Sequence, residues 1–141
     1  MINWIEMEFF LHQVGIHKWG GESKDKSYTL PPLNEIKRDL QKCIEQLDNK
    51  VENESYDYWD LVSKANAALC LWLLNGHYKP EEENLISEAY TRTWEFVGSK
   101  NKKMSEIEHF NLLIDFGSLL KTKSVSATIT KLKNDLEKVI R

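Results

Sequence analysis

The sequence has few of the residues that cross-link a chain or interrupt regular structure. Its 141 residues include two cysteines, three prolines and six glycines. Cys43 and Cys70 have neither metal-binding nor redox spacing, and each stands among apolar residues of an expected helix. A free thiol there behaves as a small hydrophobic side chain. We therefore expect a reduced, cytoplasmic protein that needs no disulfide.

Long hydrophobic runs are also absent. The longest, over residues 65–74, contains Asn66 and is too short to span a bilayer. The first ten residues lack a basic leader and carry Glu6 and Glu8 where a signal peptide requires uninterrupted apolar residues. These absences predict a soluble protein with no membrane partner.

Recognisable catalytic motifs are missing as well. The chain has no P-loop, no Rossmann glycine pattern, no nucleophile elbow and no HExxH motif. The best metal-like fragment is Glu106 with His109, whose spacing places both on one helical face, but a di-iron bundle needs that motif on two helices. We expect no metal and no cofactor. The missing motifs favour a non-catalytic protein and leave enzymatic activity open.

Charge is unevenly distributed along the chain. The whole chain has a net charge of −3; residues 1–98 hold 10 basic and 17 acidic residues, whereas residues 99–141 hold 9 and 5. The strong positive field required for non-specific binding to duplex DNA is therefore absent overall. A basic patch is still predicted around a C-terminal set of lysines: Lys100, Lys102, Lys103, Lys121 and Lys123. The simpler interpretation of this set is a solvated loop and helix face.

Apolar residues spaced by three and four positions predict about six helices. The expected ranges are 2–13, 33–51, 56–75, 80–97, 105–120 and 126–140. No alternation of period two is long enough for a strand. The expected fold is all-α: a single-domain bundle over residues 1–141 with mostly antiparallel neighbours.

The helix expected over residues 56–75 is apolar nearly all round, which is typical of a central element. Ser55 or Asp57 can cap its start and Gly76 its end. Asp60 and Lys64 are spaced for an ion pair along it. Asn66 is expected to hydrogen-bond across the bundle, because buried polar groups need partners.

A capping box is predicted to open the fifth helix. Ser105 and Glu108 have the spacing in which each side chain satisfies the other's backbone N–H. This reading makes Glu106 a first-turn acid and makes residues 99–103 a linker.

Residues 58–74 resemble, in their aromatic and alanine-rich composition, helices of HEPN-type bundles, many of which process RNA. Catalytic members of that family carry an Arg followed four to six residues later by His. Arg38, Arg92 and Arg141 have no such partner in this sequence. The resemblance covers about one helix, and the sequence lacks the active motif of the catalytic members.

Two functions remain after these exclusions. The first is a non-catalytic protein-interaction or regulatory module, in which Trp19 and Tyr28 of the long loop before Pro31 contact the partner as aromatic anchors. The alternative is a helical bundle that binds or processes nucleic acid or a nucleotide. In it, the C-terminal lysines named above would contact phosphate and nearby aromatic rings would stack on bases. The oligomeric state stays open.

Overall fold

The computed structural model describes residues 2–13, 31–54, 57–76, 80–95, 100–118 and 124–138. Within these ranges the chain is all-α, as predicted, with no strand. Its six helices are α1 (Ile2–Gln13), α2 (Leu33–Glu52), α3 (Tyr58–Asn75), α4 (Pro80–Trp94), α5 (Lys100–Gly117) and α6 (Ser124–Glu137).

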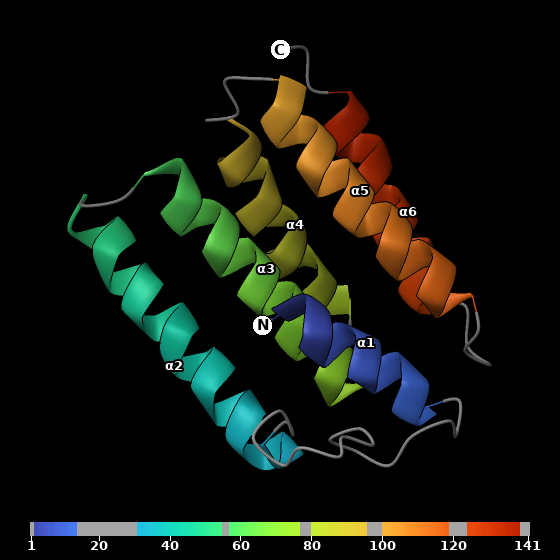
Figure 1. Ribbon diagram of the computed structural model, residues 1–141. Coiled ribbons are helices and arrows are strands. Elements are labelled where there is room, and N and C mark those ends of the chain that lie inside the picture. Colours follow the sequence, from blue (N-terminus) through green and yellow to red (C-terminus); the bar gives the residue numbers. More distant parts are fainter. Residues whose placement is uncertain are drawn as a thin grey trace.

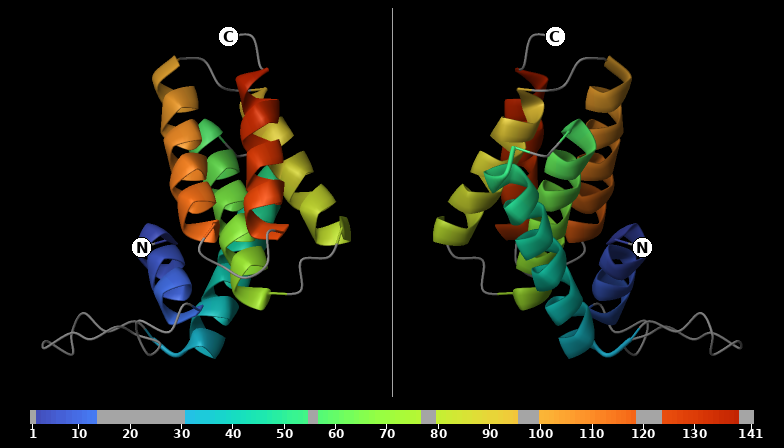
Figure 2. Two further views of the ribbon diagram at one scale, coloured as in Figure 1. Left: turned by 90° about the vertical axis from the view of Figure 1, so that its right-hand side faces the viewer. Right: turned by 90° about the vertical axis from the view of Figure 1, so that its left-hand side faces the viewer.

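The helices from α2 to α6 alternate in direction along the chain (Figure 1). The helices that pack most extensively on α3 are α2, α4 and α1. The α5–α6 pair joins this group through contacts of α4 with α6 and of α1 with α5. Figure 2 shows α1 at one end of the bundle, beside the ends of α3 and α5. Buried side chains of all six helices form one hydrophobic cluster.

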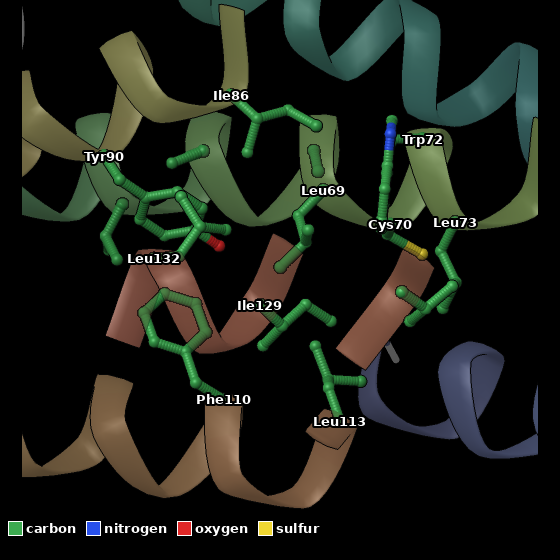
Figure 3. Close-up of a cluster of buried hydrophobic side chains, with 14 of the residues drawn as sticks. Leu69, Cys70, Trp72, Leu73, Ile86, Tyr90, Phe110, Leu113, Ile129 and Leu132 are labelled. Atoms are coloured by element: carbon green, nitrogen blue, oxygen red, sulfur yellow. The ribbon is translucent and has the colours of Figure 1, made fainter. Parts of the chain in front are cut away.

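The central position of α3 follows from its sequence. Leu69 and Cys70 are fully buried, as is Ala65 on the same helix. Figure 3 shows α3 side chains meeting those of α4, α5 and α6 in the core. Both predicted ends are confirmed. Asp57 accepts the backbone N–H of Asp60 in a capping box, and Gly76 ends the helix at a φ of 71°, where a residue with Cβ is strained.

The start of α5 differs from the prediction. The helix begins at Lys100, so residues 100–103 of the expected linker form its first turn, and Ser105 lies inside the helix and does not cap it. Glu106 accordingly lies inside the helix and is buried (8% exposed). A capping signal is local, and here α5 continues past it toward its N-terminus while Glu106 faces the core.

The charged side chains of α3 pair with α2 and not with each other, so the predicted Asp60–Lys64 pair is wrong. Lys64 contacts Asp48, and Nζ of Lys50 lies 3.2 Å from Oδ1 of Asp60. Asp60 also closes the capping box, which directs its carboxylate toward the start of α3. The α2–α3 interface therefore carries two ion pairs at its edge.

None of the helices in the described ranges is long and apolar enough to cross a membrane.

Candidate functional site

A group of polar side chains lies buried where α1, α3, α4 and α5 meet. Its members come from four helices and are called here the polar cluster: Glu6, Asn66, Tyr90, Glu106 and His109. The cluster lies inside an otherwise apolar bundle, so its groups must find partners among themselves.

Glu6 and His109 form the link between α1 and α5. Oε1 of Glu6 lies 2.9 Å from Nε2 of His109, across 103 residues of sequence. Only 2% of the Glu6 side chain and 11% of the His109 side chain is exposed. Oε2 of Glu6 is buried and has no hydrogen-bond partner among the described residues. One carboxylate oxygen is therefore satisfied and the other is left in an apolar setting.

Glu106 and Asn66 extend the cluster toward α3 and α4. The amide of Asn66 donates a hydrogen bond to the Glu106 carboxylate. Oδ1 of Asn66 in turn accepts the hydroxyl of Tyr90 at 2.6 Å, which confirms the predicted bond across the bundle. Oε2 of Glu106, like that of Glu6, is buried with no hydrogen-bond partner in the described ranges.

The pKa values of the cluster follow from burial and from its two carboxylates. Burial raises the pKa of Glu106 above 4.5, although His109 and Asn66 oppose that shift. Burial alone lowers the pKa of His109, but the hydrogen bond and charge of Glu6, together with the charge of Glu106, raise it above 6.5. Burial and Glu106 also raise the pKa of Tyr58 to about 12 and that of Tyr90 well above 10.

A carboxylate–imidazole pair can transfer protons, but a substrate must reach it. Here Glu6 is 1% exposed and Glu106 8%, so a substrate reaches them only if helices separate. Within the described ranges no three His, Cys, Asp or Glu side chains are arranged to hold a metal ion. Glu106 and His109 do share one face of α5, and there they contact Asn66 and Glu6. The cluster is suited to holding helices together and to binding protons.

A second feature is an apolar hollow between α3 and α4. It has a volume of about 130 Å³ and is lined by Ala68, Trp72, Glu82, Leu85 and Ile86. Leu85 stands at its rim with 67% of its surface exposed. We call this feature the α3/α4 hollow.

The predicted site residues are only partly within the described ranges. Trp19, Tyr28, Lys121 and Lys123 lie outside them. Lys100, Lys102 and Lys103 lie in the first turn of α5.

Lys102 lies beside aromatic residues of α3. Its Nζ is 4.6 Å from the ring centroid of Tyr58 and 5.6 Å from that of Trp59, a cation–π arrangement. Trp59 is 62% exposed. The start of α5 thus brings one predicted lysine next to an accessible aromatic ring.

Comparison with known proteins adds no relative: the chain matches no protein-family model, no curated protein and no solved structure. Functional inference therefore rests on the geometry of the polar cluster, the α3/α4 hollow and the surface near Trp59.

Sequence reasoning missed Glu6 as a member of the cluster. A signal was present, since Glu6 is spaced by four residues from Ile2 and by three from Phe9, on the apolar stripe of the helix. A carboxylate on such a stripe indicates a buried partner elsewhere in the fold.

Proposed function

We propose that this chain is a non-catalytic protein-interaction module that binds a segment of another protein at the α3/α4 hollow. The observation that carries the proposal is the hollow itself, with apolar walls and an exposed leucine at its rim. Interface hot spots are commonly large side chains seated in well-packed pockets from which water is excluded.

The size of the hollow indicates what it would hold. An engineered apolar cavity of about 150 Å³ in another protein holds one benzene molecule. The α3/α4 hollow, at about 130 Å³, is therefore suited to one Leu, Met or Phe side chain of the partner. Because its walls are apolar apart from Glu82, an acidic anchor would lose its hydration there and meet a like charge.

The surroundings of the hollow indicate the charge of the partner. Glu81, Glu82 and Glu83 form the first turn of α4, and Glu88 is exposed farther along it. Residues 1–98, which include both walls, hold 17 acidic and 10 basic residues. An apolar anchor flanked by Lys or Arg complements this surface, because opposite charges favour encounter and orientation.

A cytoplasmic location belongs to the same proposal. Cys43 and Cys70 are both free thiols, and thiols stay reduced in that compartment.

Nucleic-acid binding is the second candidate, supported by one observation. Lys102 of α5 lies over Tyr58 and the exposed Trp59. An accessible ring beside a basic side chain is the combination on which single-stranded nucleic acids stack and neutralise phosphate. The acidic net charge of the chain opposes this function.

One capture experiment separates the two candidates. The tagged protein is used to capture partners from lysate of its own host, with and without nuclease. We expect a stoichiometric protein that survives nuclease and is lost with Leu85→Glu, because a carboxylate at the rim repels the anchor and its apolar surroundings.

Leu112→Glu is the matched control. Leu112 is also an exposed leucine, 39% accessible, but it lies on α5. If Leu112→Glu still captures the partner and Leu85→Glu does not, with circular dichroism unchanged in both, the result supports binding at the hollow. If both variants capture the partner equally, the result contradicts it. Nucleic acid that is captured by the wild type and lost with Trp59→Ala and Lys102→Glu would favour the second candidate instead.

A further inference from the structure

The polar cluster holds more acid groups than its single imidazole can balance. Glu6 on α1 and Glu106 on α5 both lie near His109, and each has one buried oxygen without a hydrogen-bond partner in the described ranges. With both carboxylates ionised, a protonated His109 still leaves one excess negative charge. With His109 neutral, the excess is two. Each proton that the cluster takes up therefore reduces uncompensated charge in an apolar setting.

The link between Glu6 and His109 is also a main polar attachment of α1. This helix packs on α3 and α5, and Oε1 of Glu6 lies 2.9 Å from Nε2 of His109. An apolar attachment lies beside it: Phe10, 1% exposed, stacks on Phe116 of α5 with 5.5 Å between ring centroids. Apolar contacts of this kind do not titrate, whereas protonation acts on α1 at the link through Glu6.

The ionisable groups that face this link come from every helix around it. Tyr58 and Cys70 stand on α3, Tyr90 on α4 and Glu106 on α5, in addition to Glu6 on α1. The tyrosines and the buried thiol have pKa values raised by burial, so they stay neutral at ordinary pH. Beside them, His109 and Glu106 have pKa values raised above their ordinary ones.

We propose that the Glu6–His109–Glu106 group is a buried proton-binding site that holds α1 on the bundle when it is protonated and releases α1 as the pH rises. Release uncovers the apolar residues Ile5, Phe9 and Phe10, now buried against the bundle. The proposal concerns the attachment of α1 and does not depend on the function of the α3/α4 hollow.

The direction of the pH effect follows from the cluster. The pKa of His109 is raised on folding, so its stabilising contribution is complete below 6.5 and is lost as pH rises through the folded value. The pKa of Glu106 is also raised, so ionising it above 4.5 costs stability in the folded state. Both effects weaken the attachment of α1 as the pH rises. The loss from His109 falls above pH 6.5, so the attachment is weaker at pH 8 than at pH 6.

Hydrogen exchange of the whole protein tests this. Exchange of peptides from α1, corrected for intrinsic rates, is compared with peptides from α6 at pH 6 and pH 8. We expect α1 to lose protection relative to α6 by about tenfold for each pH unit by which the pKa of His109 is raised. Equal protection ratios at the two pH values would overturn the proposal.

Three variants assign the effect to the cluster. His109→Gln is expected to abolish the pH dependence and Glu6→Gln to reduce it. Met7→Gln is the control, because Met7 is an exposed side chain of the same helix that does not titrate, and it must leave the dependence unchanged. A pH dependence that persists in His109→Gln, or that disappears in Met7→Gln, contradicts the proposal.

A direct titration covers the case in which His109→Gln does not fold. The imidazole of His109 is followed by NMR in the wild-type protein across pH 5 to 9. We expect a pKa above 6.5 that falls in Glu6→Gln. A value at or below 6.5 in the wild type would overturn the proposal whatever the variants do.

Discussion

At the scale of single residues, buried polar side chains set strict conditions on how the helices pack. The hydroxyl of Tyr90, a residue with no exposed surface, donates to Oδ1 of Asn66 at 2.6 Å. Asn66 uses its amide for Glu106, so the three side chains depend on each other's positions. A small change in one of them leaves a buried group without its partner, which costs more than an average hydrogen bond contributes.

Tyr90→Phe tests this dependence. It removes one oxygen from the core and leaves Oδ1 of Asn66 unsatisfied, so we expect the free energy of unfolding to fall by about 1–3 kcal/mol. Urea denaturation measures the change. Thr91→Val on the same helix removes an exposed hydroxyl and is expected to stay within about 0.5 kcal/mol of the wild type. Equal effects of the two variants would contradict the assigned role of the Tyr90–Asn66 bond.

The sequence predicted a buried hydrogen bond for Asn66 but not the one that Glu6 makes. A polar residue within an apolar helix signals that a partner exists, and for Asn66 this sufficed. The partner of Glu6 is His109, 103 residues away, and only packing of α1 on α5 brings them together. Local periodicity contains no information about that contact.

At the scale of helices, close approach between α5 and α6 is allowed by a glycine. A Cβ built on Gly117 would lie 2.8 Å from Oγ of Ser126 and 3.2 Å from Cγ1 of Val125. Gly117 is the last residue of α5. The structure shows that it is the position where α6 returns against α5.

Gly117→Ala therefore has two opposing effects. Alanine favours the helix by about 1 kcal/mol over glycine, whereas overpacking costs about 1–3 kcal/mol. We expect net destabilisation in thermal unfolding. Ser126→Ala removes the nearest obstructing atom, so the double variant should lose less than the two single changes added together. A Gly117→Ala protein more stable than the wild type would show that the helices separate easily there.

Helix ends were predictable where the signal had no competitor. Helix α3 begins at the Asp57 cap and ends at the Gly76 cap, as expected, because a capping carboxylate and a left-handed glycine act locally. The capping box predicted at Ser105 is wrong, because α5 already begins at Lys100 and Ser105 lies inside it. Lys64 pairs with Asp48 of α2 and not with Asp60 of its own helix, because the packing of α2 on α3 brings Asp48 close.

At the scale of the whole molecule, the apolar core and the candidate binding surface are separate features. The core joins all six helices in one cluster, as apolar spacing predicts. The α3/α4 hollow arises from the way two of these helices pack, and it leaves Leu85 exposed at its rim. Surfaces of this kind depend on packing order, which periodicity does not specify.

Photo-crosslinking in host cells tests the proposed function most directly. A benzophenone amino acid replaces Leu85 at the rim of the hollow, and in a control chain it replaces Leu112 on α5. We predict one discrete protein adduct from position 85, whose crosslinked peptide carries an apolar residue flanked by Lys or Arg. Ala68→Phe, which fills the hollow, should suppress it. No adduct from position 85, or the same adduct from position 112, would contradict the proposal that this chain binds a partner at the α3/α4 hollow.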